Sequence, residues 1–227
     1  MTADPNAPTP TLPLSAEQLL TTTRAVRKRL DFDRPVPRAL LRECVEAALQ
    51  APSGSNRWAM QFVIVTDPER RRALADVYRA GYALYREMDG VYIGSVDKGD
   101  EELNRQQQRT ARSADHLAEN MHRAPALVVA CAPGRAEGDV APIRKTTLLG
   151  SVLPGMWSFM LAARLRGLGT AWTTVHLFKE QDAADVLGIP NDAVTMGALT
   201  PVAFTKGTDF RPALRPDPDS VIHWDRW

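Results

Sequence analysis

The sequence has little of the features that mark metal-binding and redox-dithiol proteins. It holds two cysteines, Cys44 and Cys131, in 227 residues, together with four scattered histidines. No Cys-x-x-Cys pair occurs and the histidines do not cluster with the cysteines, so the pattern indicates neither a zinc site nor a redox dithiol. We expect both thiols to be buried and unreactive.

The chain also lacks a strong net charge and long apolar runs. Its formal net charge is +1, which gives no electrostatic reason to expect nucleic acid or an anionic membrane as a partner. No run approaches the ~18 apolar residues of a membrane-spanning helix. Residues 1–13 are rich in proline and threonine and lack the pattern of a signal peptide. We therefore expect a cytoplasmic protein with a flexible N-terminal arm.

Two common nucleotide-binding signatures are missing as well. No Gly-x-Gly-x-x-Gly follows a predicted strand, and no Walker-type phosphate loop occurs. No histidine is assigned a catalytic role. A nucleotide or flavin site must therefore be sought in other residue patterns.

The remaining composition is that of a globular protein. Apolar residues make up 44% of the chain, and residues 14–227 contain neither an internal repeat nor an evident linker, so we expect one domain. Helices dominate over few strands, which predicts the α+β class. Helices are expected from Ser15, over 38–50, from Pro68 to the region of Tyr85, and over 110–123, 145–166 and 179–187. Strands are expected over 62–65, 126–131, 171–175 and 196–204.

Local signals support several of these boundaries. Ser15 and Gln18 form a capping box, and Pro68 follows a good N-cap residue. Pro154 should kink its helix or mark the true start, and the apolar surround of residues 152–161 is typical of a central or interfacial helix. Residues 88–108 are polar and glycine-containing, so we expect a long, mobile excursion, partly helical at best, that covers the substrate side of a site.

The stretch from 51 to 65 contains a polar loop between a helix and a strand. Pro52 disfavours helix at the preceding residue, Gly54 permits positive φ or a close approach to the backbone, and Ser53, Ser55 and Asn56 carry short hydrogen-bonding side chains. Such residues also dominate ordinary turns. Taken alone, the loop is therefore better interpreted as an ordinary helix-to-strand turn than as a ligand-binding loop.

A basic cluster lies upstream of this loop. Arg24 and Arg27 are three residues apart, which places them on one face if the segment is helical. Arginine forms bidentate contacts with phosphate oxygens, although an isolated cluster of this kind is more often a solvated helix end. Lys28 and Arg29 are assigned to the surface.

Together the two stretches resemble the nitroreductase family of FMN-dependent oxidoreductases. Three further matches follow in the same order as in that family: Gly167-Leu168-Gly169, Leu187-Gly188-Ile189-Pro190 and Pro201-Val202-Ala203-Phe204. The resemblance runs from about Leu14 to the C-terminus and is weakest between residues 81 and 112.

This resemblance implies a fold and an activity. The fold would be a nitroreductase-like central mixed or antiparallel sheet flanked by helices, in an intertwined homodimer whose C-terminal tail reaches the partner. The activity would pass hydride from NAD(P)H, the transient donor, through bound FMN to a small-molecule acceptor such as a nitroaromatic or a quinone, by a ping-pong mechanism. No acid–base side chain is expected to be obligatory, because the cofactor carries the hard chemistry.

The resemblance also implies a set of cofactor-binding residues. They are Arg24, Ala25, Arg27, Pro52, Ser53, Gly54, Asn56, Trp172, Thr173, Thr174 and Arg211. By this resemblance Arg24, Arg27 and Arg211 would bind the FMN phosphate, with Lys206 and Arg215 as alternatives to Arg211. Ala25 stands where the family usually has serine, so its backbone N–H alone would remain.

The other two segments would meet the flavin itself. In the family the loop at 53–56 meets the ring and ribityl chain from the other subunit, but Trp58 and Met60 depart from its usual residues there. The backbone N–H of Thr174 would lie beside flavin N5. Two alternatives stay open: a family branch with another reductive reaction, such as dehalogenation or flavin fragmentation, and a flavin-storage protein without turnover.

Overall fold

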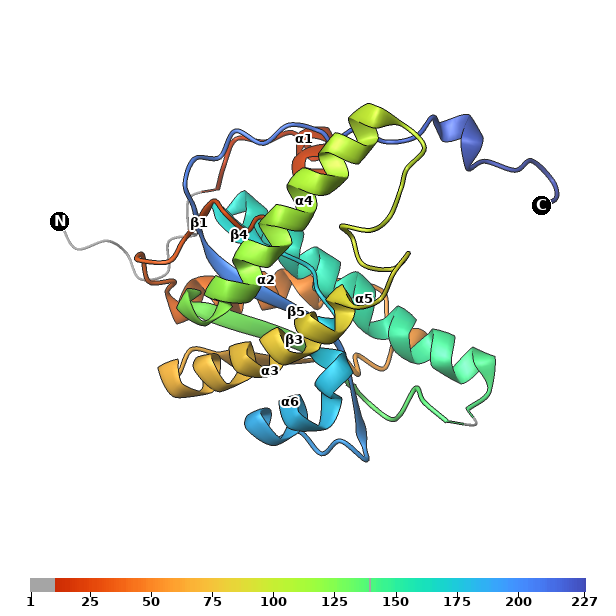
Figure 1. Ribbon diagram of the computed structural model, residues 1–227. Helices are drawn as coiled ribbons and strands as arrows, with labels where there is room; N and C mark the ends of the chain where they lie inside the picture. Colours follow the sequence, from red (N-terminus) through yellow and green to blue (C-terminus); the bar gives the residue numbers. More distant parts are fainter. Residues whose placement is uncertain (1–10, 139) are drawn as a thin grey trace.

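The computed structural model describes residues 11–138 and 140–227, in which a five-stranded antiparallel sheet lies between two helical layers (Figure 1). The strands are β1 (Leu30–Asp31), β2 (Gln61–Val65), β3 (Ala126–Pro133), β4 (Leu168–Thr170) and β5 (Val194–Thr205). The α-helices are α1 (Ala16–Thr22), α2 (Arg38–Ala48), α3 (Pro68–Arg86), α4 (Glu101–Asn120), α5 (Pro142–Leu165) and α6 (Glu180–Leu187).

Strand β5 is paired along both of its edges. Val202 is in register with Ala126 of β3 and with Thr170 of β4, so these two strands flank β5 on opposite sides. Strand β1 continues the β3 side beyond the start of β3. On the far side of β3, β2 ends the sheet and has no further strand partner in the described part of the chain.

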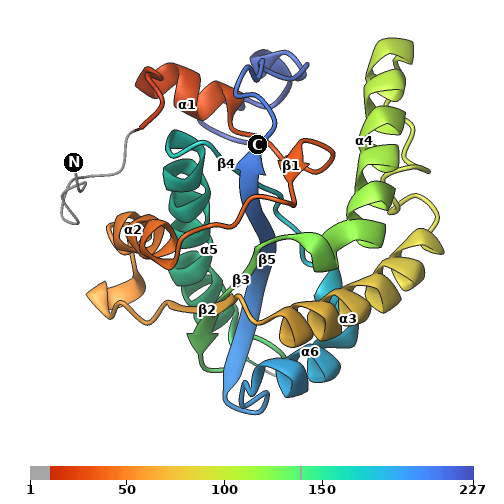
Figure 2. The same cartoon turned by 90° about the vertical axis from the view of Figure 1, so that its left-hand side faces the viewer.

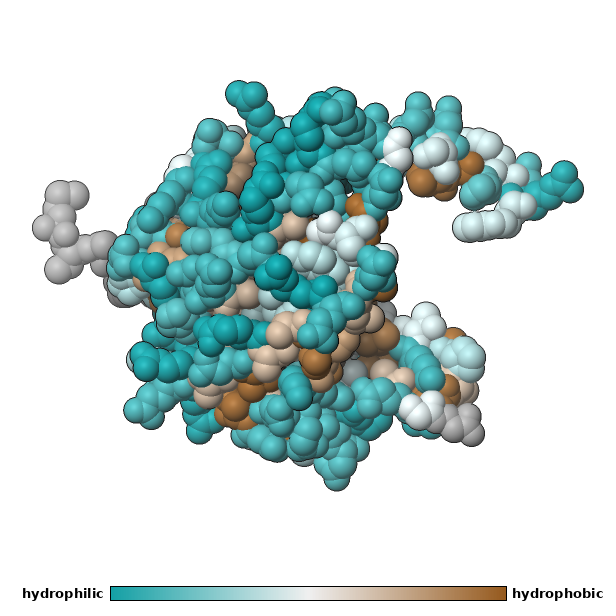
Figure 3. Space-filling model, in the orientation of Figure 1, coloured by the Kyte–Doolittle hydropathy of each residue, from teal (hydrophilic) through white to brown (hydrophobic). Residues whose placement is uncertain are grey.

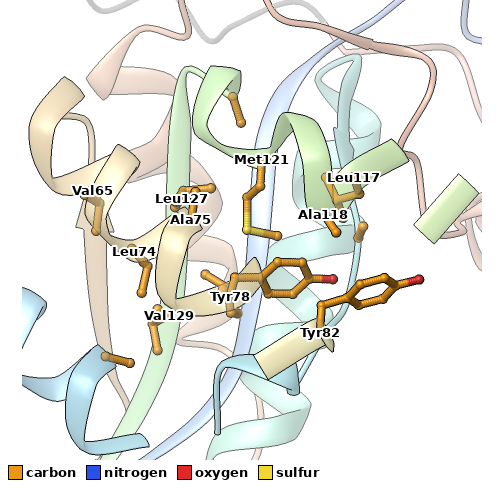
Figure 4. Close-up of a cluster of buried hydrophobic side chains, with 14 of the residues drawn as sticks. Val65, Leu74, Ala75, Tyr78, Tyr82, Leu117, Ala118, Met121, Leu127 and Val129 are labelled. Atoms are coloured by element: carbon orange, nitrogen blue, oxygen red, sulfur yellow. The ribbon is translucent and has the colours of Figure 1, made fainter. Parts of the chain in front are cut away.

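Each face of the sheet carries its own hydrophobic core. Figure 2 shows α2 and α5 on one side of the strands and α3, α4 and α6 on the other. The core on the α3 side includes Leu74 and Tyr78 of α3, Leu117 of α4 and Leu127 of β3, which Figure 4 shows gathered around Met121. Burial on both faces explains why β3 reads as a nearly continuous apolar run.

Helix α5 fills the core between α2 and the sheet. Val152, Met156, Phe159 and Met160 are buried against that face, so the central position predicted for this helix is confirmed. By length and composition α5 is also apolar enough to cross a membrane, which the sequence had not led us to expect, and half of its most apolar window is buried. The core helix of a globular domain meets the same criterion.

Several predicted boundaries are confirmed together with their causes. Ser15 accepts a hydrogen bond from Gln18 N–H while the Gln18 side chain accepts from Ser15 N–H, which completes the capping box. Asp67 caps α3 by accepting from Arg70 N–H. Gly188 ends α6 with φ 67°, in the left-handed region that glycine favours.

The largest correction concerns residues 88–108. The irregular part ends at Gly99, because Asp100 accepts a hydrogen bond from Leu103 N–H and starts α4 nine residues before the helix start we predicted at residue 110. The remaining turns are held by side chains: Asn104 binds Asp97 at 2.6 Å, and Gln108 donates to the Gly94 carbonyl at 2.9 Å. Glycines and charges therefore mark a turn followed by an amphipathic helix.

Three smaller predictions also need correction. Strand β1 falls at the edge of the predicted loop at 31–37, since two residues carry too little pattern to be recognised. Helix α5 begins at Pro142 and contains Pro154 in its interior. The regular strand near residue 171 is β4, which ends at Thr170, and Thr173 beyond it forms an isolated bridge to Leu199.

The terminal regions and the cysteines complete the comparison. The predicted arm at 1–13 lies outside the described residues except for its last three, where Leu12 N–H donates to the Leu165 carbonyl at 2.6 Å.

Cys44 and Cys131 are free and buried, as predicted, and burial raises the pKa of each thiol to about 12. Both thiols are therefore protonated at neutral pH.

The tail after β5 is anchored by one aromatic ring. The guanidinium groups of Arg29 and Arg164 both lie over the Phe210 ring, at 4.3 and 4.7 Å from its centroid. Arg29 also pairs with Asp209 at 2.5 Å, and Arg164 donates to the Thr208 carbonyl. These contacts direct the following residues across the molecule toward α4.

The buried His176 gives the fold a testable pH dependence. Neither ring nitrogen has a hydrogen-bond partner in the described chain, and burial lowers the pKa to about 4, with Glu180 opposing the shift. Because the unfolded chain binds this proton more readily, the free energy of unfolding should fall by up to about 3 kcal/mol as pH drops from 6.5 toward 4.

Denaturant unfolding across that pH range measures the slope. His176→Leu should flatten it, whereas His223→Leu, in the exposed tail, should leave it unchanged. An unchanged slope in His176→Leu would show that other groups carry the acid sensitivity.

Candidate functional site

A polar cavity of about 710 Å³, here called the arginine cavity, lies between the segment after α1, helix α4 and the tail. Its lining residues are Arg24, Ala25, Arg27, Glu102, Gln106, Gln107, Arg109, Thr110, Ser113, Pro212, Ala213, Leu214 and Arg215. Four arginines face a single acidic residue. This charge balance suits an anionic ligand such as a phosphate.

The sheet positions the first two arginines. Helix α1 ends at Thr22, so Arg24 and Arg27 do not share a helix face, contrary to the prediction. Instead, Val26 N–H donates to the Thr170 carbonyl of β4 at 2.7 Å, and the Val26 side chain is buried in the core. This backbone bond holds both flanking arginines beside the cavity.

Arg27 carries a charge without a partner. It is half-buried, and no acceptor or acidic residue pairs with it in the described chain. Burial lowers its pKa, which Tyr78, Tyr82 and Tyr85 oppose. Because an unpaired buried charge is costly, this guanidinium fits a ligand that supplies negative charge or acceptor oxygens.

Two of the tail cations considered from the sequence, Arg211 and Arg215, reach this region in different ways. Arg211 reaches the site through its carbonyl, which accepts from Arg24 Nη1 at 2.8 Å, whereas Arg215 lines the cavity. Gln106 of α4 and Leu214 exchange two longer hydrogen bonds, at 3.3 and 3.5 Å, which hold the tail over the cavity. Lys206 does not line it.

A second cavity of about 350 Å³, here called the aromatic cavity, shares Arg27 with the first. Three tyrosines of α3 form one wall and Trp172, Thr173 and Thr174 another. Val91 and Ile93, from the segment predicted to cover the substrate side, also line this cavity. The complete lining is Arg27, Tyr78, Tyr82, Tyr85, Val91, Ile93, Ala114, Leu117, Trp172, Thr173, Thr174, Val175 and Phe178.

The wall at 172–174 is fixed by the sheet. Thr173 exchanges two backbone hydrogen bonds with Leu199 of β5, at 3.0 and 2.8 Å. Thr174 is exposed to the cavity, and its N–H has no acceptor in the described residues. Gly81 lets α3 approach the backbone at Val175 closely, because a Cβ on this glycine would lie 2.3 Å from the Val175 carbonyl oxygen.

The loop at 52–56 lies elsewhere. Gly54 N–H donates to Ser151 Oγ at 2.9 Å, and a Cβ on Gly54 would lie 2.5 Å from the Thr147 side chain. Gly54 is therefore needed for close approach to α5, while the positive φ values fall on Ser55, Asn56 and Trp58. Pro52 and Asn56 are exposed.

This loop lines a third cavity of about 350 Å³, the loop cavity, which shares no lining residue with the other two. Arg57, Arg135 and Arg144 also line it. The Ser53 hydroxyl is buried and lacks a hydrogen-bond partner among the described residues. In a single chain, the structure thus brings the residues 24–27 and 172–174 together and leaves the loop apart.

Sequence reasoning missed two contributors to the site. Tyr78, Tyr82 and Tyr85 follow the i, i+4, i+7 spacing of one helix face, a signal that was readable but equally typical of a core-facing helix. Arg109 lines the arginine cavity from α4, at the junction between the excursion predicted over 88–108 and the helix predicted over 110–123. Only the helical geometry brings it near Arg24.

Comparison with known families decides the assignment. A model of the nitroreductase family matches residues 20–201. The chain belongs to the nitroreductase family. The match spans Arg24, the loop at 52–56 and residues 172–174, and family membership supports an oxidoreductase.

Solved nitroreductase-like structures share the fold. An FMN- and NADPH-dependent nitroreductase from Sphigopyxis sp. strain HMH aligns with a TM-score of 0.66 at 23% identity, over 94% of this chain and all of that one. An iodotyrosine deiodinase bound to FMN and 3-iodo-L-tyrosine aligns with a TM-score of 0.66 at 18% identity, over 93% of this chain and 99% of that one. At these identities the likeness concerns the fold.

A curated relative provides a local match. An NADH dehydrogenase from Thermus thermophilus is 46% identical over 68 residues, which is 29% of this chain and 32% of that enzyme. The match thus spans about a third of the relative.

The arginine cavity predicts a phosphate-specific loss. Charge-assisted hydrogen bonds contribute roughly 1.5–3 kcal/mol each, so Arg24→Ala and Arg215→Ala should each weaken FMN binding by roughly tenfold to a hundredfold. Riboflavin, which lacks the phosphate, should bind the wild type poorly and be little affected. Equilibrium dialysis of both ligands measures this.

Two variants serve as controls. Lys28→Ala removes a neighbouring cation that does not line the cavity, and Arg211→Ala keeps the carbonyl that holds Arg24. Both should bind FMN nearly as well as the wild type. Equal losses for FMN and riboflavin in Arg24→Ala would assign that arginine to the fold.

Proposed function

We propose that this chain is an FMN-dependent oxidoreductase that passes hydride from NAD(P)H to a small organic acceptor, with donor and acceptor bound in turn. The observation that carries the proposal is the half-buried, unpaired Arg27, which joins an arginine-lined cavity to an aromatic one. A flavin mononucleotide matches this pair of cavities, because it has a phosphate at one end and a planar ring at the other.

The residues present fit such a ligand. Arg24 and Arg215 would bind the phosphate, with Arg109 across the cavity on α4. Thr174 would donate its free N–H to an acceptor atom of the ring, and the charge of Arg27 would favour electron density on it. The cofactor supplies the hydride chemistry when bound, and the chain supplies placement and electrostatics.

We propose further that the working unit is a homodimer with two sites at its interface. The loop at 52–56 cannot complete the site of its own chain, since it lines a separate cavity. A second copy would bring its loop, including the unpartnered Ser53 hydroxyl, to the first copy's aromatic cavity. Exposed Ile143, Trp58 and Trp157 near the loop and along α5 are apolar surface that such an interface would bury.

The C-terminal tail supports the same assembly. After residue 215 it leaves the body of the molecule, and Val221, Ile222, Trp224 and Trp227 are exposed. Figure 3 shows a hollow between this tail and the N-terminal end of α5, with apolar side chains on its wall. A tail with so much apolar surface gains stability by covering a second chain.

The acceptor class follows from the proposed site. Nitroaromatics and quinones are planar electrophiles that suit an aromatic cavity, and we place the protein in the cytoplasm, where NAD(P)H is available. A reductive branch with a different reaction uses the same binding groups. Storage of FMN without turnover is the remaining alternative. A test with NADH and NADPH as electron donors distinguishes storage from turnover.

The donor test uses the colour of the flavin. Purified protein should be yellow, bleach anaerobically on addition of NADH or NADPH, and regain its colour on addition of a quinone or a nitroaromatic. Absorbance in the flavin band measures both half-reactions. A yellow protein that neither nicotinamide bleaches would support storage, and a colourless protein that gains no band with added FMN would refute the proposal.

The assembly is tested by sedimentation. The FMN-loaded chain should sediment as a dimer at micromolar concentration, and a chain ending at Arg215 should dissociate at lower concentration than the full chain, because it lacks the exposed apolar residues of the tail. A flavin-loaded monomer of the full chain at micromolar concentration would contradict the dimer.

A further inference from the structure

The first part of the tail, residues 206–215, crosses the molecule without joining a helix or a strand and is here called the strap. Figure 1 shows this part of the chain in blue, running from the end of β5 past α1 to the start of α4. Gly207 turns it away from β5 with φ 77°, and a Cβ there would lie 2.5 Å from Arg29 Nη2. Residues 212–215 line the arginine cavity. The strap therefore connects the sheet to one wall of the candidate site.

Arginine side chains hold most of the strap in place. Arg29, Arg164 and Arg24 donate, in that order, to the strap carbonyls at 206, 208 and 211, at 2.8, 2.9 and 2.8 Å. Beyond Lys206, whose N–H donates to the Arg29 carbonyl, the strap forms no backbone-to-backbone hydrogen bond with the rest of the described chain. Segments held in this way can open locally while the sheet stays folded.

Phe210 is the strap's main contact with the folded body. Its half-buried ring packs against the core on the α3 side, and the guanidinium groups of Arg29 and Arg164 lie over it. Cations over an aromatic face are attracted by its electron density. The ring therefore acts as a latch that keeps the strap closed.

Arg164 makes the closed strap costly. Its side chain belongs to a residue that is only 4% exposed, yet Nε and Nη1 have no hydrogen-bond partner and no carboxylate pairs with it in the described part of the chain. Burial lowers its pKa, and the charge of Arg29 lowers the pKa further. Opening the strap would return these nitrogens to water, which offsets part of the stability that the latch provides.

A ligand in the arginine cavity would act in the opposite direction. Arg24 lines the cavity from the segment that the sheet fixes, and Arg215 lines it from the strap. Neither forms an ion pair within the described residues, so the two charges repel across an empty cavity. A phosphate that contacts both needs the strap closed. Such a ligand stabilises the closed arrangement by the difference between its affinities for the two arrangements.

We propose that residues 206–215 are a strap that a phosphate group in the arginine cavity holds closed, and that Phe210 is its latch. Phe210 is thus a positioning residue, since it acts on the phosphate through Arg24 and Arg215. That the phosphate belongs to FMN rests on the proposed function. Closure of the strap by a phosphate is a property of the fold that can be measured without turnover.

Hydrogen–deuterium exchange of the full chain, read by mass spectrometry, tests the closure. Leu214 N–H, which donates to the Gln106 side chain at 3.3 Å, is one reporter within the strap. Saturating FMN should slow exchange in residues 206–215 by roughly tenfold. Riboflavin, which lacks the phosphate, should leave it within about twofold of the rate in the ligand-free protein.

The latch is tested with variants of Phe210 in the same assay. Phe210→Ala should speed the release of FMN by roughly tenfold, because both cation–π contacts are lost, and should leave riboflavin release unchanged. Phe210→Tyr keeps the ring and should resemble the wild type. Asp209→Asn is the matched control, since it removes the exposed ion pair with Arg29 next to the latch, and such pairs contribute little.

FMN that binds without slowing exchange in the strap, or riboflavin that slows it equally, would overturn closure by the phosphate. An unchanged rate of FMN release in Phe210→Ala would overturn the latch. If the protein takes up no FMN, exchange is followed with inorganic pyrophosphate. Protection of the strap that Phe210→Ala removes would then refute the proposed function and keep the strap, and no protection would refute both.

Discussion

The pairing of β5 along both edges is the constraint on which the candidate site depends. Twelve residues of β5 hold β3 on one side and β4 on the other. Beyond β4, Leu199 fixes Thr173, and through Thr170 of β4 the sheet also fixes Val26. Two segments almost 150 residues apart thus become the adjoining walls of one site, and the rigidity of a doubly buried strand passes to both.

The site itself is organised by unsatisfied groups. Arg27 is half-buried without a counter-ion in the described chain, Thr174 keeps an N–H free, and the Tyr85 hydroxyl, which accepts from Ile93 N–H, keeps its proton. Folded proteins pair most buried polar groups, so unpaired groups that face shared cavities indicate a ligand. The core around them is conventional, with committed partners such as Asp115 for Tyr82. Donors without a partner therefore mark the residues that can bind a ligand, and donors with a partner mark residues that stabilise the fold.

Local chemistry made much of the fold predictable. The capping box at Ser15, the N-cap at Asp67 and the left-handed stop at Gly188 each depend on a few adjacent residues, and each was found where expected. The start of α4 was predicted nine residues too late. The first half of this helix is polar, and its few apolar residues form a stripe only when helical geometry is assumed. The resemblance favoured Arg211 with Arg215 as an alternative, and the sequence could not decide which of them lines the cavity, because the path of a proline-rich tail depends on where Phe210 packs.

The sequence by itself determined the class of fold, the position of most helices and strands, the inert thiols and the family resemblance, because these follow from short-range preferences and ordered motifs. The tertiary structure decided which residues meet. It placed Arg27 between two cavities, lined one of them with three tyrosines of α3 and turned the loop at 52–56 onto α5. Those choices depend on packing between distant segments, where close approach at Gly54 and Gly81 and the registers of β5 set the geometry. No local pattern records such contacts, since their energy exists only once the chain has folded.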